Sequence, residues 1–317
     1  MSNEKRTMRD SFLEELYLRM KKDKNIFFLS VDFGAPKLDD IRRSFPDRFI
    51  NVGIAEQNLV NVATGLALEG FSVYAFGIST FLSMRAFEQI RIDLALQAQI
   101  KTLNVNLIGV GAGLSYGVSG PTHHCLEDLA LMRILPNVAI FSPCDWTTAK
   151  DFVDYSLKNK TPKYLRFDSK PCAPLVDARR VEISAGFREI KKGEDLCVVS
   201  TGHMSHLALL AADYLAEDGI NIGLIDMFLL RPFDEAGLIK ILRRYKNVIT
   251  THEGFLNKGG LDTVVTSLCA SQDKNINLRH FGFNDHYIFE IGSRDYLHKK
   301  HKISVVDLIS AVKESLF

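Results

Sequence analysis

The sequence has few cysteines, no long hydrophobic run and no excess of charge of either sign. Its five cysteines lie far apart, in an odd number and without the CxxC spacing of a zinc site. This pattern favours buried thiols in a reducing cytoplasm over disulfide bonds. No apolar stretch approaches the roughly 18 residues that span a bilayer, and residues 1–10 are polar, unlike a signal peptide. We therefore expect a cytoplasmic protein with no membrane partner.

Lys and Arg together number 39 and Asp and Glu 38, so the net charge is +1. Proteins that bind nucleic acid usually carry a basic patch, and the sequence has no block of like charge, so we expect no nucleic-acid partner. Apolar residues make up 46% and charged residues 24%, as in globular proteins, which excludes disorder and a fibrous repeat. The 317 residues are enough for two domains of roughly 100–200 residues each.

Short β-branched runs alternate with helical patterns along the first half of the chain. The runs predict strands at 26–32, 72–76, 105–110, 138–142 and 164–167. Between them, apolar residues at helical spacing predict helices at 12–20, 59–66, 81–99 and 147–158. This alternation is typical of a parallel sheet that is covered on both faces by helices.

The alternation is interrupted at 169–185, where Pro171, Pro174 and the pair Arg179–Arg180 lie in a stretch without periodicity. It resumes with strands predicted at 196–200, 220–229, 248–251 and 276–281 and helices at 205–217, 234–244, 259–270 and 305–316. We predict an α/β fold with two domains, each a mainly parallel sheet flanked by helices. Their limits are residues 1–170 and 185–317, with a linker at 171–184.

A glycine-rich loop follows the strand predicted at 105–110. It does not match the dinucleotide motif GxGxxG because position 114 is Leu, and no phosphate-binding P-loop motif is present. What remains is a loop whose glycines permit close backbone approach, ending in Gly120-Pro-Thr-His-His. Taken alone, this loop is either structural or part of a site at the end of a strand.

Glu56 begins a predicted helix, where the helix dipole favours a carboxylate whether or not the residue has a chemical role. The spacing of His203 and His206, and of His298 and His301, could place two imidazoles on one metal. Neither pair has a third ligand nearby in the sequence, so we interpret them as a helix-end pair and a surface pair.

Aromatic and basic residues alternate in the helix predicted at 81–99. Phe81 and Phe87 could form a shelf for a flat ring, or they could belong to the core. Arg85 and Arg91 could hold an anionic ligand, or they could pair with Glu88 on a solvated face.

Four motifs follow one another along the first half of the sequence, and together they identify a protein family more specifically than any one of them does alone. They are the runs Arg48 to Asn58, Ser79 to Arg91, Gly117 to His124 and Glu127 to Asn137. This series resembles the pyrimidine-binding domain of transketolases. The second half resembles the transketolase C-terminal domain in Ser200-Thr-Gly, Thr251-His-Glu-Gly and Gly259-Gly-Leu. The resemblance covers nearly the whole chain.

The resemblance implies a thiamine diphosphate enzyme that transfers a two-carbon ketol unit from a ketose or ketose phosphate to an aldose or aldose phosphate. Transketolases hold the diphosphate and Mg²⁺ with a Gly-Asp-Gly motif on an N-terminal domain, and this sequence has no Gly-Asp dipeptide. The chain therefore resembles the C-terminal subunit of a split transketolase, active only with an N-terminal partner subunit that carries the diphosphate domain. The family's geometry also implies a homodimer of this chain within an α2β2 heterotetramer.

The resemblance assigns roles to five residues. Glu56 matches the carboxyl that hydrogen-bonds the aminopyrimidine ring, a role that calls for a protonated group of raised pKa. Phe81, with Phe87 beside it, matches the aromatic platform under the pyrimidine. His123 matches the histidine that binds substrate oxygens, and Asp32 falls near the cofactor.

The resemblance also bears on the substrate. Arg9 matches a phosphate ligand of the family, and Arg85 matches an anion-binding arginine of 1-deoxyxylulose-5-phosphate synthases. However, Ser119 stands where transketolases of sugar phosphates usually have Asp, Ser169 where they have a phosphate-binding Arg, and Pro36 where they have Ser. We therefore expect phosphate to be bound by a different set of residues than in those transketolases. The donor and acceptor sugars stay open.

Three other functions stay open. The motif Arg85-Ala-Phe-Glu-Gln favours a deoxyxylulose-phosphate synthase, although that enzyme is normally a single chain. Chain length and Gly53-Ile-Ala-Glu-Gln favour a β subunit of a 2-oxo acid dehydrogenase, which Gly120-Pro-Thr-His-His opposes. A non-catalytic scaffold subunit is the third, and the intact Glu56 and His123 argue against it.

Overall fold

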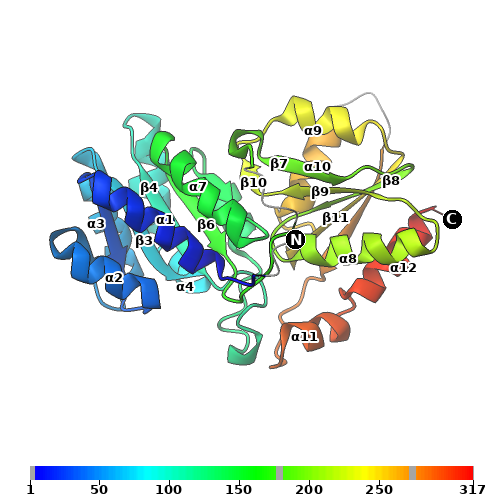
Figure 1. Cartoon of the computed structure of the whole chain (residues 1–317), viewed down its shortest axis with the longest axis horizontal. Helices are drawn as coiled ribbons and strands as arrows, with labels where there is room; N and C mark the ends of the chain where they lie inside the picture. The colour runs from blue at the N-terminus through cyan, green and yellow to red at the C-terminus, as the bar shows by residue number, and fades with distance from the viewer. Residues whose placement is uncertain (1–3, 176–180, 271–275, 317) are drawn as a thin grey trace.

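Two mainly parallel sheets, each flanked by helices, make up the computed structural model (Figure 1). The structure describes residues 4–175, 181–270 and 276–316. The predicted fold class is confirmed. The pair Arg179–Arg180, which contributed to the predicted linker, lies outside the described residues.

The first sheet has seven strands, all parallel to their neighbours except β10, which runs antiparallel to β5. Its strands are, in spatial order, β10 (Leu229–Arg231), β5 (Ala139–Phe141), β6 (Lys163–Phe167), β4 (Val105–Val110), β3 (Ser72–Ile78), β1 (Ile26–Ser30) and β2 (Phe49–Asn51). Strands β4, β5 and β6 are wholly buried, as expected of parallel strands covered on both faces.

Helices cover both faces of this sheet. They are α1 (Met8–Lys22), α2 (Pro36–Ser44), α3 (Glu56–Leu68), α4 (Ser79–Arg85), α5 (Phe87–Gln89), α6 (Asp128–Arg133) and α7 (Trp146–Lys158). On one face, α1 and α7 lie side by side and bury Phe12 and Phe152 in one apolar cluster (Figure 1). The other cluster contains Leu59 of α3 and Leu82 of α4. This second cluster therefore packs α3 and α4 together in the core.

The second sheet has five strands in the order β12 (Asn277–Phe283), β11 (Asn247–Phe255), β8 (Leu196–Ser200), β9 (Gly223–Met227) and β7 (Phe187–Lys191). Among the described strands of this second sheet, only β7 is antiparallel to its neighbour. The helices of this half are α8 (Met204–Glu217), α9 (Glu235–Leu242), α10 (Leu261–Ala270), α11 (Arg294–Lys300) and α12 (Val305–Leu316). Helices α8 and α12 pack on one face through a cluster that includes Leu215 and Leu308.

Two predicted elements differ in the structure. The strand predicted at 220–229 divides at Phe228 into β9 and β10, and β10 leaves the second sheet to pair with Phe141 of the first. The helix predicted at 81–99 is interrupted at Ala86 and continues as a π-helix at Ile90–Leu96. We propose the predicted domain limits, with β10 as a segment of the second half that completes the first sheet.

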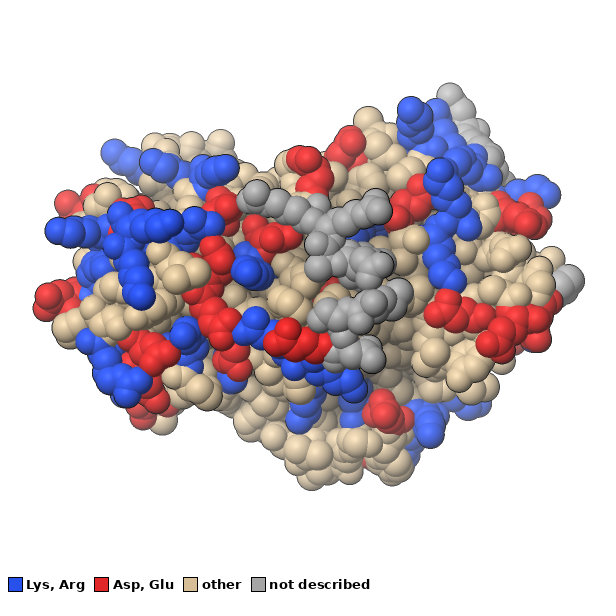
Figure 2. Space-filling model, in the orientation of Figure 1, with Lys and Arg blue, Asp and Glu red and all other residues tan. Residues whose placement is uncertain are grey.

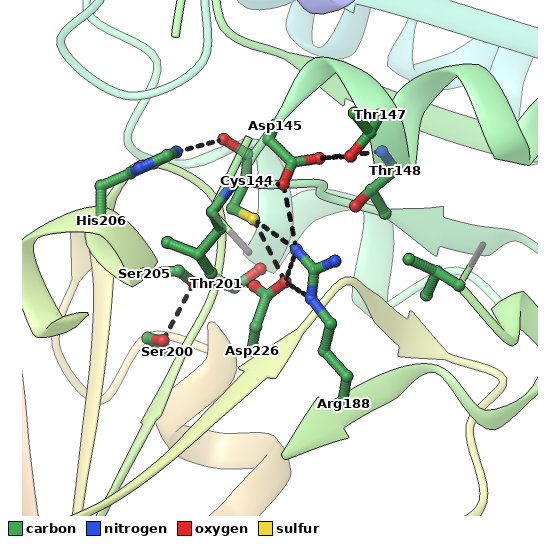
Figure 3. A network of polar contacts seen from close by, with 12 residues as sticks. Cys144, Asp145, Thr147, Thr148, Arg188, Ser200, Thr201, Ser205, His206 and Asp226 are labelled. Atoms are coloured by element: carbon green, nitrogen blue, oxygen red, sulfur yellow. Dashed lines mark hydrogen bonds and ion pairs between the residues drawn. The ribbon is translucent and has the colours of Figure 1, made fainter. Parts of the chain in front are cut away.

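A buried network joins the two halves (Figure 3). The guanidinium of Arg188 on β7 lies 3.1 Å from Asp145, which precedes α7, and 3.0 Å from Asp226 on β9. The backbone carbonyl of Cys144 accepts a hydrogen bond from Nε2 of His206 at 2.9 Å. Burial alone would raise the pKa of Asp145, but Arg188 and backbone N–H groups lower it to about 2. One arginine thus ties both sheets together through two carboxylates.

The surface mixes charges of both signs. Figure 2 shows Lys and Arg side chains interspersed with Asp and Glu side chains over one face. Among the described residues, no helix is both long enough and apolar enough to cross a bilayer.

Candidate active site

Several of the predicted site residues meet at one edge of the first sheet. Glu56 begins α3 shortly after β2, Phe81 and Arg85 lie on α4 directly after β3, and His123 lies in the loop after β4. The parallel strands β4, β3, β1 and β2 are neighbours in this order, so their carboxyl ends form one edge. This edge is where parallel α/β sheets bind ligands.

Glu56 and Arg85 form an ion pair at this edge. The residue Glu56 is 2% exposed, and its Oε2 accepts a hydrogen bond from Nη1 of Arg85 at 2.7 Å. The N-terminus of α3 adds a favourable dipole for the carboxylate. The side chain of Arg85 is 47% exposed, and the structure records no ion pair between it and Glu88, both of which it describes. The partner of Arg85 is therefore Glu56, 29 residues away in sequence.

Phe81 links this ion pair to His123. The guanidinium carbon of Arg85 lies 4.9 Å from the centroid of the Phe81 ring, a cation–π contact. The imidazole of His123 meets the same ring edge-on, with centroids 5.3 Å apart. The hydroxyl of Thr80 donates to the backbone carbonyl of His123 at 3.3 Å. Glu56, Arg85, Phe81 and His123 thus form one continuous row of contacts.

The second half of the chain supports the loop that carries His123. Nη2 of Arg294 donates to the carbonyl of Ala112 at 3.1 Å, and its Nη1 lies 2.6 Å from Asp168 at the end of β6. Gly113 has a φ of +57°, and a Cβ there would lie 2.1 Å from Oε2 of Glu253. Glycine at 113 therefore lets the loop rest directly on Glu253.

Glu253 is itself held by an arginine and a histidine. Its Oε1 lies 3.1 Å from Nε of Arg294 and 2.7 Å from Nε2 of His298. Burial would raise the pKa of Glu253, but Arg294 and His298 hold it well below its usual range. The interpretation of His298 as a surface residue is wrong, because the residue is 2% exposed. Burial lowers the pKa of His203, which lies beside His298 at a ring distance of 5.8 Å.

Tyr116 forms a further wall beside His123, with ring centroids 6.3 Å apart. Gly111, at a φ of +110°, makes room for the tyrosine ring, since a Cβ there would lie 2.4 Å from it. Burial raises the pKa of Tyr116, and the charge of Arg9 opposes this rise. The guanidinium of Arg9 is bound side-on by Asp10, at 2.8 and 3.1 Å. The sequence pattern did not single out Tyr116, because one tyrosine in a glycine-rich loop carries no periodic signal.

Asp32 lies at the carboxyl end of β1 and is exposed, with a φ of +57°. Its carboxylate accepts from the amide of Asn51 at 3.0 Å, and its backbone N–H donates to the Asn51 side chain at 3.0 Å. The backbone N–H of Gly53 donates to the same Asn51 oxygen at 3.0 Å. Asp32 thereby fixes the turn that leads to Glu56.

Phe87 does not join the row of contacts. Helix α4 ends at Arg85, and after Ala86 the Phe87 ring packs partly against the core cluster of α3 and α4. The ring also lines a surface hollow with Arg91. The described residues record no contact between Phe87 and Phe81, so a joint platform stays a prediction.

Metal ligands are not clustered in the described residues, which contain no group of three or more His, Cys, Asp or Glu side chains placed to hold a metal. The row of contacts offers instead a buried carboxyl, a half-buried aromatic ring and an imidazole. Such a set suits a flat, hydrogen-bonding heterocycle beside a polar substrate.

Comparison with known proteins identifies relatives along both halves of the chain. Residues 4–171 match the family model "Transketolase, pyrimidine binding domain" and residues 186–308 match "Transketolase, C-terminal domain". A protein of Methanocaldococcus jannaschii named as a transketolase C-terminal section is 33% identical, and the alignment covers 88% of this chain and 86% of that protein. One subunit of the apulose-4-phosphate transketolase of Actinobacillus succinogenes is 32% identical, with 86% and 87% covered.

A solved structure of similar length also matches. It is a split gene transketolase, an inactive beta4 tetramer, with 30% identity, a TM-score of 0.85 and 98% of each chain covered. The longer transketolase of Pichia stipitis shares the fold, with a TM-score of 0.83 at 17% identity, and this chain spans 46% of its length.

Proposed function

The chain belongs to the transketolase family, and from this premise we propose that it is the C-terminal subunit of a split, thiamine diphosphate-dependent transketolase. Its reaction is the transfer of a two-carbon ketol unit from a ketose, or ketose phosphate, to an aldose acceptor. The observation that carries the proposal is the row Glu56–Arg85–Phe81–His123 at the carboxyl edge of a sheet that matches the family's pyrimidine-binding domain.

The residues of the row fit the aminopyrimidine half of the cofactor. Thiamine diphosphate supplies, when bound, a thiazolium carbon that accepts the ketol unit. Glu56 holds a proton at its carboxyl toward the pyrimidine ring, in a place that excludes water because the residue is 2% exposed. The Phe81 ring packs against the flat pyrimidine ring, and His123 binds and orients the oxygens of the substrate.

The diphosphate and Mg²⁺ belong, in this proposal, to an N-terminal partner subunit. Two observations support this assignment: the described residues lack a metal-binding cluster, and relatives of similar length are named as subunits or sections of transketolases. The solved relative that forms a beta4 tetramer is inactive. We propose that this chain likewise assembles with itself and needs its partner for activity, as an α2β2 heterotetramer.

Exposed apolar side chains border the His123 loop and support an interface there. Val118, Phe289 and Ile291 are strongly exposed, and the backbone N–H of Gly292 donates to the carbonyl of Gly117 at 3.2 Å. The segment before α11 therefore extends the apolar surface of the loop. Apolar patches beside a site are typical of surfaces that a partner covers.

The test is co-expression of this chain with an N-terminal transketolase subunit. Calorimetric titration with thiamine diphosphate and Mg²⁺ should show binding by the pair and weak or no binding by this chain alone. Tight, Mg²⁺-dependent binding by the single chain would contradict the split arrangement. Transfer assays with ketose, ketose phosphate and pyruvate as donors separate transketolase from synthase and dehydrogenase chemistry. Glu56→Gln should abolish transfer, and retained transfer would refute its role.

A further inference from the structure

The side chain of Arg85 contacts both residues that the proposed function assigns to binding of the pyrimidine ring, Glu56 and Phe81. Its Nη1 binds Oε2 of Glu56 at 2.7 Å, and its guanidinium carbon lies 4.9 Å from the centre of the Phe81 ring. One long, half-exposed side chain therefore covers the carboxyl and the aromatic ring at the same time. The inference drawn from this contact rests on the proposed function.

Within the part of the chain that the structure describes, Arg85 is the one cation in contact with Glu56. Helix α3 packs on β1, β3, β4, α4, α5 and the π-helix. The charged side chains of those elements are Arg85, Glu88, Arg91 and Asp93. Of these four described side chains, only Arg85 forms a hydrogen bond or ion pair with Glu56. His123, in the loop after β4, contacts the Phe81 ring and not Glu56. Without Arg85, the Glu56 carboxylate, in a residue that is 2% exposed, would be buried without a contacting cation among the described residues, which is costly.

The cation of the Arg85–Glu56 pair is much more exposed than the cation of a fully buried ion pair in the same protein. Arg166 and Asp128, 2.8 Å apart, have side chains that are 2% and 0% exposed, so neither can leave without stranding a buried charge. Arg85 is 47% exposed and can keep its charge by turning into solvent. When the pair opens, the Arg85 charge can therefore be solvated, whereas the Glu56 carboxylate, 3% exposed, stays buried.

We propose that Arg85 is a gate on the cofactor site that holds Glu56 ionised until the pyrimidine ring displaces the guanidinium. When the pair opens, Arg85 stays charged in solvent and Glu56 takes up one proton from solvent to become a neutral carboxylic acid. Arg85 acts through Glu56 and is a positioning residue.

The test counts protons in the co-expressed complex. Thiamine diphosphate with saturating Mg²⁺ is titrated by calorimetry near neutral pH in two buffers of different ionisation heat. Glu56→Gln, which has no carboxyl, gives the baseline. The wild-type complex should take up about one proton more than this baseline, and Arg85→Gln should match the baseline because its Glu56 is already neutral. Arg85→Gln should also bind up to about tenfold more tightly, since no ion pair has to open.

Two further variants separate a gate from a merely structural contact. Arg91→Gln, on the π-helix that follows α4 and α5, should take up as many protons as the wild type. Arg85→Lys should restore most of the uptake that Arg85→Gln loses. Equal uptake by wild type and Glu56→Gln overturns the proposal even if Arg85→Gln fails to assemble. Weaker cofactor binding by Arg85→Gln also overturns it. Failure of the wild-type complex to bind thiamine diphosphate refutes the proposed function instead.

Discussion

Replacing Arg188 with Met should be among the most destabilising single changes in this chain. The Arg188 guanidinium is the cation that lies against Asp145 and Asp226, at 3.1 and 3.0 Å, and both aspartate side chains are 0% exposed. Methionine fills a similar volume but leaves two buried carboxylates facing each other without a cation. Removing one partner of a buried ion pair typically costs about 3–5 kcal/mol.

The pH dependence of stability predicts the direction in which the stability deficit of Arg188→Met changes, as well as its magnitude. The pKa of Asp145 is about 2 in the folded wild type against an ordinary 3.8, which corresponds to about 2 kcal/mol of stability. This contribution is present above the unfolded pKa and is lost as the pH falls from about 4 to about 2. In Arg188→Met, burial and the neighbouring Asp226 carboxylate should raise the Asp145 pKa above its unfolded value. The variant's deficit should then shrink as the pH falls.

Urea unfolding of the full chain, followed by circular dichroism, measures both effects. Lys313→Met is the matched control, because its ion pair with Asp218 is exposed on both sides, at 43% and 58%, and should cost less than about 1 kcal/mol. The reasoning is refuted if Arg188→Met loses no more stability than the control. It is also refuted if the deficit grows toward acidic pH, since the buried carboxylates would then not be the cause.

Three other outcomes are expected. Glu56→Gln should lower ketol transfer by the complex at least about a hundredfold, while its urea midpoint stays near that of the wild type; a slower rate that tracks lost stability would contradict this. Gly113→Ala should cost about 1–3 kcal/mol and reduce transfer, because its Cβ collides with Glu253 at a positive φ, whereas Gly65→Ala, with open space around it in α3, should be neutral or stabilising. Ile291→Glu should weaken co-purification with the N-terminal partner without changing the urea midpoint; unchanged assembly would place the interface elsewhere.

Elements with strong periodicity could be predicted from sequence, and short ones could not. The strand at 105–110 and the helix at 305–316 have the predicted bounds, because each carries a regular apolar pattern over its whole length. Strand β2 has three residues and is half exposed, so its apolar pattern is too short to predict a strand. Its hydrogen bonds with β1 hold it in the sheet. The crossing of β10 into the first sheet is a long-range event that no local pattern encodes.

The site was predictable in part for a similar reason. Glu56, Phe81, Arg85 and His123 lie in motifs whose order and spacing can be recognised, and the structure brings all four into contact. The identity of the partner of Arg85 was not predictable. Glu88 lies close in sequence, but Glu56 is brought near by the packing of α3 against α4.

The support that the His123 loop receives from the second half was also not predictable, because no motif contains both partners. Arg294 begins a seven-residue helix that sequence periodicity did not indicate, yet it contacts Ala112, Asp168 and Glu253. Two of these partners belong to the first half of the chain, on either side of the His123 loop. Because the side chain of Arg294 is only 10% exposed, separating it from these partners would strand a buried charge. The C-terminal half therefore shapes the substrate side of the proposed site, while the exposed Arg85 leaves its cofactor side free to rearrange.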